Sequence, residues 1–592
     1  MVCQLIQVCL EQAPPYDALS YTWGTALKLE NLYHMSMDSA ALDSSGDIME
    51  ITQNLHGALV QLRDRVVRRR LWVDAVCIDQ ANIKERGEQV QIMRRIFTNA
   101  THVWIWLGLE ESSTSDALQA IAMIDSHREK MGLSFTALKA ITDEDPYTEI
   151  LGLRDITIDQ RSTHALHRLF SRPWFRRIWV VQEVNVDCRK VEVLIGPKQV
   201  PWNHVGAAAL WLGALRWSAP KPEASQGQRN AMVMWQGRMF AGATLPPLLD
   251  EAREYLATDA HDKVFALLGF PSFQRLIEDF GFSANYTHSV SELYKLVAIL
   301  SIKSTRTLEI LSYVDHSQSP HFDVETKSLS LSQVTMDSSW VPRWDMETPY
   351  RSFPLQDYAH YRNRTNGVCT SIEPKGDAIQ LNGLSIGDLL TTAEHIDWIS
   401  DSSGLMMCNP DVLIHFWKAI TQHKNARMSN EYFLIGLSHA MTAGLDENYG
   451  PATKNSAQHV ADFIEFLLPM FSCEPCEHNS QTLRPAFYEM LLHMQRREYL
   501  GDRTRYSRDV SWICTNRRLF YTSGGFIGLG PSNIRANDVV AVLFGGHTPF
   551  LLRPRTGCYQ LIGEAYVYGM MDGEAMEWLS TGRFSEQLFL LR

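Results

Sequence analysis

The sequence predicts an α/β fold: an open parallel sheet with flanking helices at the N-terminus, a mainly helical middle region and a β-rich C-terminal region. Two observations carry this prediction. Between Leu71 and Gly108, two almost continuous apolar runs flank a segment with helical periodicity, as expected for buried parallel strands joined by a helical crossover. From residue 518 onward, short apolar runs alternate with Gly, Pro and Asn, which is typical of a small antiparallel sheet or barrel.

The first region, residues 1–201, contains the elements of the parallel sheet. Three strands are predicted, at Ala18–Tyr21, Leu71–Ile78 and Val103–Leu107. The helix between the second and third strands has apolar residues at helical spacing, namely Val90, Met93, Ile96 and Phe97. Two further helices are predicted at Leu166–Phe170 and Phe175–Val184, because Pro173 is tolerated in a first helical turn but not inside a helix.

The remaining chain divides into two regions. Residues 202–363 are predicted to be mainly helical, with a Ser-rich flexible insertion at Ser317–Ser338 and an aromatic plug at Trp340–Trp344. Residues 376–592 are predicted as an α+β region with a helical insertion between Asn409 and Arg497. Its strands are predicted at Ala378–Ile386, Arg518–Tyr521, Phe526–Leu529, Val539–Leu543, Phe550–Arg553 and Tyr559–Ile562.

Length, charge and the apolar runs exclude several classes of protein. At 592 residues the chain is too long for one hydrophobic core. A net charge of -12 and a pI near 5.9 argue against a nucleic-acid-binding protein. No run of about eighteen apolar residues occurs, and no basic segment precedes the first apolar residues. We therefore expect no membrane span and no secretory signal, and we place the protein in the cytoplasm.

Metal ligands are sparse in the sequence. Cys473, Cys476 and His478 form a CxxCxH cluster, but a structural zinc site needs four ligands and no second ligand pair stands near it. The ten cysteines are scattered without the dense spacing of a disulfide scaffold. We therefore predict neither a metal site nor a resident cofactor.

Polar side chains gather at the carboxyl end of the second predicted strand. Asp74, Asp79 and Gln80 lie at or beyond this end. Parallel sheets with right-handed crossovers bind ligands at the carboxyl ends of their strands, so a cleft there would be acidic. The two aspartates either contribute to such a site or cap the next helix by accepting free backbone N–H groups.

Glu183 is the leading catalytic candidate. It follows Trp179 by four residues on a predicted helix, so the two side chains share one helix face. An aromatic ring beside a carboxylate can hold a flat heteroaromatic group while the carboxylate stabilises a positive ribosyl centre. In the alternative interpretation Glu183 pairs with Arg176 or Arg177 and Trp179 fills the core.

Other motifs argue against common enzymes. Gly524, Gly525, Gly528 and Gly530 lie among predicted strands, so we interpret them as hairpin turns and not as a dinucleotide-binding loop. No GxSxG, HExxH or phosphate-loop motif occurs. Their absence argues against the commonest hydrolases, metalloproteases and nucleoside triphosphatases.

Three N-terminal segments together closely resemble the fungal heterokaryon incompatibility (HET) domain. They are YDALSYTWG, the segment from LWVDAVCIDQ to VWIWLG, and RPWFRRIWVVQEV. The similarity extends to ATDAHDKVFALLGF at Ala257–Phe270, to SSWVPRW, and to the C-terminal segments from FYTSGGFIGLGP to YVYGMMDGEA. The family usually has Asn at the position of Asp79 and Arg at the position of His261. HET domains usually carry another strand upstream of YDALSYTWG, which implies a shortened N-terminus here.

The resemblance implies a cytosolic effector of fungal non-self recognition that triggers programmed cell death. The same three segments are also similar to the strand and helix motifs of TIR domains, which implies a TIR-like domain at residues 1–201. In enzymatic TIR domains the glutamate of the helix motif cleaves the nicotinamide–ribose bond of NAD. By this similarity Glu183 becomes the catalytic carboxylate and Trp179 a packing or stacking neighbour, with Tyr21, Trp23 and Asp74 as substrate-binding candidates.

Two functions therefore remain open. The first is NAD hydrolysis by the N-terminal domain, with NAD as substrate, after self-association of the domain. The second is a non-enzymatic, homotypic interaction module whose middle and C-terminal regions sense or recruit an unidentified protein partner. The fold alone does not decide between them, because related folds often serve purely as adaptors.

Overall fold

The computed structural model describes residues 2–24, 28–34, 48–64, 66–141, 156, 158–185, 191–216, 226–237, 243–316, 338–346, 353, 374–400, 406–423, 429–446, 450–472, 484–494 and 499–592. The chain forms two compact units, Met1–Val290 and Ser291–Arg592. The division between them falls inside residues 202–363, the region predicted to be mainly helical.

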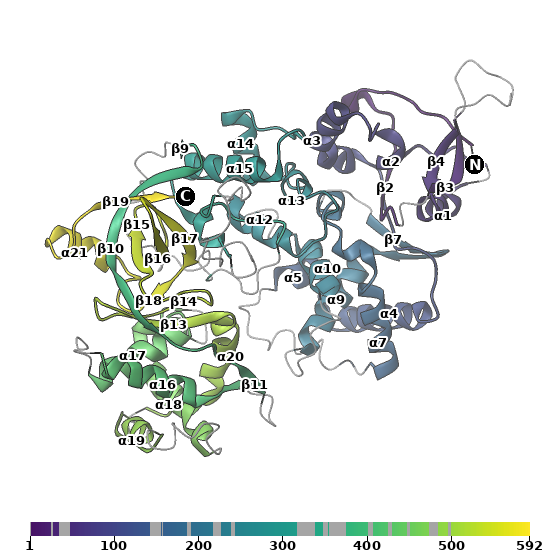
Figure 1. Cartoon of the computed structure of the whole chain (residues 1–592). Coiled ribbons are helices and arrows are strands. Elements are labelled where there is room, and N and C mark those ends of the chain that lie inside the picture. The colour runs from purple at the N-terminus through teal and green to yellow at the C-terminus, as the bar shows by residue number, and fades with distance from the viewer. Residues whose placement is uncertain are drawn as a thin grey trace. The chain divides into compact units, whose positions relative to one another are not determined.

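A five-stranded sheet lies at the centre of the described part of the first unit (Figure 1). Its strands, in spatial order, are β5 (Leu71–Trp72), β2 (Asp17–Tyr21), β6 (Val103–Trp106), β7 (Val191–Ile195) and β8 (Lys198–Pro201). The first four are parallel, and β8 pairs antiparallel with β7. Of these five strands, β2 comes first in the chain, and it lies between β5 and β6, which come second and third. The strand order reverses between β2 and β6, which is where open α/β sheets bind ligands.

Helices form most of the rest of the first unit. They are α1 (Gln53–Leu62), α2 (Asp74–Cys77), α3 (Ile83–Asn99), α4 (Thr114–Lys130), α5 (Phe135–Ala140), α7 (Gln160–Phe170), α8 (Val180–Val184), α9 (Trp202–Arg216), α10 (Gln226–Gln236), α12 (Leu245–Arg253), α13 (Asp262–Phe265) and α14 (Pro271–Phe280). A small sheet of β1 (Val2–Cys3), β3 (Lys28–His34) and β4 (Ile48–Thr52) precedes α1.

The two faces of β2 pack against different helices. Leu19 and Tyr21 share a core cluster with the apolar residues of α1. Ala18 shares a cluster on the opposite face with Met93 and Phe97 of α3. All four apolar residues predicted to face the core from α3 are buried. Since side chains alternate along a strand, Ser20 points to the same face as Ala18.

The predicted strand Leu71–Ile78 is wrong beyond Trp72. Asp74–Cys77 instead forms the helical turn α2, in which the Asp74 carboxylate accepts the N–H of Ala75 at 2.7 Å. A short apolar run does not distinguish a buried strand from a buried helical turn. Asp74 therefore lies at the start of a helix, immediately after the strand.

The predicted helix Phe175–Val184 is confirmed only over α8. Its first residues belong to a 3-10 turn, Pro173–Arg176. Arg177 then forms a β-bridge with Leu256, and the N–H of Ile178 donates to the carbonyl of Leu256 at 2.9 Å. This pairing with a residue far along the chain extends the backbone at Arg177 and shortens the helix.

The described residues of the second unit form a closed β-barrel with an added antiparallel layer (Figure 1). The barrel strands, in order, are β15 (Val539–Leu543), β16 (Phe550–Arg555), β17 (Cys558–Glu564), β19 (Gln587–Leu591) and β10 (Ala378–Thr392), and β10 pairs back with β15. The far end of β10 continues into β13 (Arg517–Thr522), β14 (Ile527–Pro531) and β18 (Tyr566–Val567). Two short pieces, β11 (Trp398–Ser400) and β12 (Met406–Cys408), pair separately, and β9 (Pro374–Lys375) pairs with β10. The prediction of an antiparallel sheet or barrel is confirmed.

Helices of the second unit lie mostly between β12 and β13, where the helical insertion was predicted. They are α15 (Val290–Thr305), which starts at the unit boundary, α16 (Pro410–Thr421), α17 (Asn430–Met441), α18 (Ser456–Leu467), α19 (Arg484–Met494), α20 (Arg503–Cys514) and α21 (Glu574–Ser580). Helix α20 extends the helical part beyond the predicted limit at Arg497.

The glycine-rich segment is only partly a turn. Gly524 and Gly525 connect β13 to β14, and Gly525 has a φ of 87°. Gly528 and Gly530 lie inside β14, where a Cβ on Gly528 would come within 2.3 Å of the Phe520 ring. The second pair therefore serves close packing and not chain reversal.

The predicted aromatic plug is buried. Trp340 and Trp344 are both 0% exposed, and Trp340 Nε1 donates to the carbonyl of Asp377 at 3.0 Å. The insertion that precedes the plug, up to residue 337, lies outside the described residues, as do Cys473, Cys476 and His478.

No helix in the described ranges combines the length and the apolar character needed to cross a bilayer. In the same ranges no group of three His, Cys, Asp or Glu side chains is placed to hold a metal ion.

Candidate functional site

Glu183 lies in the core on the face of β2 that carries Ser20. Its helix, α8, packs against α3 and β2, and the residue is 1% exposed. Ser20 Oγ donates a hydrogen bond to Glu183 Oε2 and accepts one from Trp174 Nε1 at 2.8 Å. A serine one residue before the end of β2 thus connects an indole to the candidate carboxylate.

Arg177 joins the end of β2 to two carboxylates. Its guanidinium donates to the backbone carbonyl of Tyr21, and it lies 3.2 Å from Asp74 Oδ2 and 3.8 Å from Glu183 Oε1. Trp23 Nε1 donates to the same Asp74 oxygen at 2.9 Å. Four of the five predicted site residues therefore belong to one network, and Arg177 is its centre.

The charges of this network are set by burial and by Arg177. Burial raises the pKa of Glu183 to about 7, although the Arg177 cation and the Ser20 hydrogen bond lower it. Burial also lowers the pKa of Arg177, but Glu183 and Asp74 outweigh it and keep that pKa above its ordinary value. Burial, and then the Asp74 charge, raise the pKa of Tyr21. The site thus pairs a permanent cation with a carboxyl group that titrates near neutral pH, a property common at functional sites.

Trp179 is the one predicted site residue outside this network. It packs against the cluster that contains Ala18 and Phe97, and its Nε1 donates to Asp262 Oδ2 at 3.0 Å. Burial raises the pKa of Asp262 to about 6. The Trp179 ring, which was expected to act together with Glu183, therefore donates its N–H to a different carboxylate, that of Asp262.

A second arginine occupies the neighbouring strand end. Arg172 donates to the carbonyls of Leu107 and Leu109, which follow β6, at 2.8 and 3.0 Å. Trp23 and Leu109 are 41% and 71% exposed at the ends of β2 and β6. The carboxyl edge of the sheet thus has two guanidinium groups inside and two exposed apolar side chains outside, where an acidic cleft was predicted.

Asp79 and Gln80 have local roles beside this edge. Asp79 Oδ1 accepts the N–H of Ala81 at 3.0 Å, and Gln80 Nε2 donates to the carbonyl of Asp74 at 3.2 Å. Asp79 therefore forms a local turn before α3 and does not cap that helix; Asn82 does so, because its Oδ1 accepts the N–H of Glu85 at 3.2 Å.

The segment Ala257–Phe270 holds α8 from outside the sheet. Asp262 accepts from Trp179, and Gln182 Nε2 donates to the carbonyl of Phe265 at 3.5 Å. Arg94 of α3 adds a bond to the carbonyl of Gly269 at 2.8 Å. The position of Glu183 therefore depends on contacts that come from about eighty residues further along the chain.

Ser20, Trp174 and Asp262 were missed by sequence reasoning. The available signals were a serine at an inward position of the strand DALSY and an aspartate directly before the apolar run KVFALLGF. Both mark polar groups forced into a core, where a hydrogen-bond partner is required.

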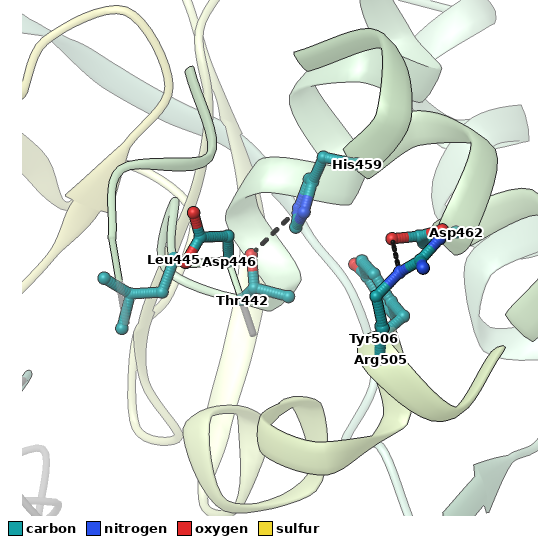
Figure 2. A pocket seen from close by; sticks show the side chains of 7 residues that line it. All are labelled: Thr442, Leu445, Asp446, His459, Asp462, Arg505 and Tyr506. Carbon is teal, nitrogen blue, oxygen red and sulfur yellow. Dashed lines mark hydrogen bonds and ion pairs between the residues drawn. The ribbon is translucent and has the colours of Figure 1, made fainter. Parts of the chain in front are cut away.

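A second polar cluster lies among the helices of the second unit, around a small pocket (Figure 2). Its lining residues are Thr442, Leu445, Asp446, His459, Asp462, Arg505 and Tyr506. His459 Nε2 lies 3.1 Å from Thr442 Oγ1, and Arg505 forms two bonds of 2.9 and 2.7 Å to Asp462. Burial lowers the pKa of His459 to about 4 and that of the neighbouring His439 to about 3. These imidazoles are therefore uncharged near neutral pH.

Comparison with known proteins gives two family matches. Residues 16–183 match the family model for the heterokaryon incompatibility protein (HET), and residues 478–585 match the Het-6 beta-barrel domain. The chain is also 23% identical to heterokaryon incompatibility protein 6, OR allele, of Neurospora crassa, over 97% of this chain and 92% of that protein. No solved structure matches the chain. The first match includes all five predicted site residues and ends at Glu183, whereas the contacts that hold α8 extend to Phe265.

Proposed function

The chain is a heterokaryon incompatibility (HET) domain protein, and from this premise we propose that it is a cytoplasmic effector of fungal non-self recognition and programmed cell death. We further propose that its N-terminal domain, which we take to be TIR-like, hydrolyses NAD. The observation that supports the enzymatic proposal best is the Glu183 carboxyl group, which has a pKa of about 7 and lies beside the carboxyl ends of parallel strands.

The proposed reaction uses Glu183 as an electrostatic catalyst. As the bond from nicotinamide to ribose breaks, the bond electrons leave with nicotinamide and the ribosyl carbon becomes positive. The Glu183 carboxylate stabilises this centre, as carboxylates stabilise oxocarbenium ions in glycosidases. Water then adds to the carbon and releases a proton, so the products are nicotinamide, ADP-ribose and one proton.

This reaction requires the site to open. Glu183 is 1% exposed and both of its oxygens have partners, Ser20 on one and Arg177 on the other. Substrate reaches the carboxylate only when the segment that carries Arg177 moves away from it. We therefore propose that self-association of the N-terminal domain drives this opening, which makes the activity depend on protein concentration.

The test measures nicotinamide release from NAD by the purified full chain at several protein concentrations. We expect release that rises more steeply than the protein concentration and that is lost in Glu183→Gln. Glu129→Gln is the matched control, because it is the same substitution at a side chain that is 68% exposed. Equal rates in Glu183→Gln and the wild type would refute the assignment.

A second candidate function is the non-enzymatic interaction module. The observation that favours it is the burial of Glu183 in a fully occupied ion pair and hydrogen bond, which is what a structural role needs. In this case cells that express Glu183→Asp die as wild-type cells do, although no nicotinamide is released. An exposed substitution in the same domain, such as Arg95→Glu, then prevents death instead; Arg95 is 59% exposed.

A further inference from the structure

His261 makes two hydrogen bonds that require two donors. Its Nδ1 lies 2.6 Å from Asp259 Oδ1 and its Nε2 lies 2.7 Å from the backbone carbonyl of His288. The neutral imidazole ring has one N–H and one lone pair, whereas the protonated ring has two N–H groups. A backbone carbonyl never donates, so Nε2 must carry a proton.

The proton at Nδ1 also belongs to the ring. Asp259 Oδ1 already accepts the backbone N–H of His261 at 3.1 Å, as expected of an ionised carboxylate. Carboxylic acids are stronger acids than imidazolium ions, so a proton shared between the two rests on the imidazole. The observed pair of contacts therefore corresponds to a positively charged His261 beside a negatively charged Asp259.

We propose that His261 is a proton-operated latch that fastens the loop at residues 285–288 to the start of α13. In the protonated state both bonds form. Loss of one proton places a nitrogen lone pair against an oxygen at one of the two contacts, so that contact becomes repulsive and opens. This inference goes beyond the proposed function and does not depend on it.

A second polar contact joins this loop to α13. Tyr286 Oη donates to Asp262 Oδ1 at 2.9 Å, next to the His261 bond. The other oxygen of Asp262 accepts from Trp179, which begins α8. Asp262 therefore links the loop held by His261 to the residue that begins α8.

The charged and titratable groups around His261 come from three segments. Asp259 and Asp262 lie on its own segment, and Tyr286 and His288 lie on the loop. Arg86 of α3 stacks on the Tyr286 ring at 3.7 Å and faces the cluster from the third side. Two carboxylates, one guanidinium group, one phenol and one further imidazole therefore surround the His261 ring.

The experiment compares hydrogen exchange of peptides that cover residues 283–289 in the full chain at pH 5.5 and pH 8.5, after correction for the intrinsic exchange rate. We expect protection of the wild-type loop to fall about tenfold at the higher pH, since a bond to a charged group is lost. His261→Gln, which never carries the charge, should have low protection at both pH values. His288→Gln is the matched control, because it removes the nearest other imidazole but keeps the backbone carbonyl, and it should behave as the wild type does.

Two results would overturn the proposal. One is a wild-type loop whose corrected protection is equal at both pH values, and the other is a pH response that survives in His261→Gln. If His261→Gln fails to fold, nitrogen-15 spectra of histidine-labelled wild-type protein decide the question. At pH 5.5 both ring nitrogens of His261 must have the shifts of protonated nitrogen, and a neutral tautomer there contradicts the latch.

Discussion

Two buried polar clusters of this protein, one in each compact unit, respond to burial in opposite ways. In the first unit Glu183 lies against Arg177, and burial moves its pKa up to about 7. In the second unit His439 and His459 lie with ring centroids 4.9 Å apart, and burial moves their pKa values down to about 3 and 4. Burial disfavours the charged form in each case. Burial therefore brings the pKa of the carboxyl group toward neutral pH and moves the pKa values of the imidazoles away from it.

The difference separates a cluster that can change charge in the cell from one that cannot. Near neutral pH a small change around Arg177 alters the ionisation of Glu183, whereas the histidines of the second unit stay neutral. The pocket in Figure 2 therefore combines an uncharged imidazole with an ion pair whose carboxylate, that of Asp462, is buried. Electrostatic catalysis or switching is expected in the first unit.

The largest expected effect comes from the central cation of each cluster. Arg177→Met leaves Asp74 and Glu183 buried without their partner, so the first unit should lose about 3–5 kcal/mol of stability. Arg505→Met is the matched change in the second unit. Arg505 is 34% exposed, so solvent screens its charge, and Asp462 keeps hydrogen bonds from Gln458 and Asp502 at 2.9 and 2.8 Å. We therefore expect a loss of about 1 kcal/mol.

Urea unfolding checks this pair of variants, with hydrogen exchange to assign each transition to its unit. Equal losses of stability in the two variants would show that both arginines stabilise their units to the same extent. The proposed difference between the two clusters would then be wrong.

The next effect is an opposite pH dependence of the two units. Folded Glu183 keeps its proton up to about pH 7, while the unfolded residue loses it near its ordinary pKa of 4.5. The folded state then binds more protons, so the stability of the first unit falls as the pH rises from about 4.5 to 7, by about 1 kcal/mol per pH unit.

The histidines give the opposite slope in the second unit. Folded His459 loses its proton near pH 4 and the unfolded residue near 6.5, so stability rises with pH between these values and is complete above them. Stability is measured from pH 4.5 to 6.5 in the wild type, in Glu183→Gln and in His459→Gln. Asp262 in the first unit and His439 in the second add slopes of the same sign, so each substitution should reduce, and not abolish, the slope of its own unit only. A slope that stays unchanged in its own variant would refute the assignment.

A smaller effect is expected at the hydroxyl groups. Ser20→Ala removes the donor to Glu183 and the acceptor of Trp174, which should cost about 1–3 kcal/mol and raise the pKa of Glu183 further. Thr442→Val removes a hydroxyl beside the neutral His459 and should cost about 1 kcal/mol without moving any titration near pH 7.

A double-mutant cycle of Ser20→Ala with Glu183→Gln measures the coupling of the two side chains. No coupling would mean that the Ser20 bond does not set the charge of Glu183.

The elements predicted correctly are those whose pattern is local. The helical spacing from Val90 to Phe97 identified the buried face of α3, and the short apolar runs after residue 518 identified the barrel strands. The strand at Leu71 was extended too far because an apolar run alone does not reveal that Asp74 begins a helical turn. The helix at Phe175 was too long because its first part pairs with Leu256, which no local pattern shows.

The site was predictable only as a set of carboxylates at the carboxyl end of a sheet. Asp74 and Glu183 were found because acidic residues beside buried strands are conspicuous in the sequence. The contacts between them could not be predicted. Arg177 pairs with Asp74, more than a hundred residues earlier in the chain, and with Glu183, six residues later. The same limit explains Trp179, whose spacing from Glu183 was correct but whose partner is Asp262.

The smallest effect sharpens the difference between Trp179 and Glu183. Trp179→Phe keeps an aromatic ring in the cluster of Ala18 and Phe97 and removes the donor to Asp262, so we expect a loss of about 1 kcal/mol. The pKa of Asp262, which burial already raises to about 6, should rise further because the Trp179 bond lowers it. Nicotinamide release by this variant should match the wild type, since Trp179 lies outside the Arg177 network. Loss of release from a folded Trp179→Phe variant would instead place the indole against the substrate, and the opening of the site would then have to free Trp179 from Asp262 as well as Glu183 from Arg177.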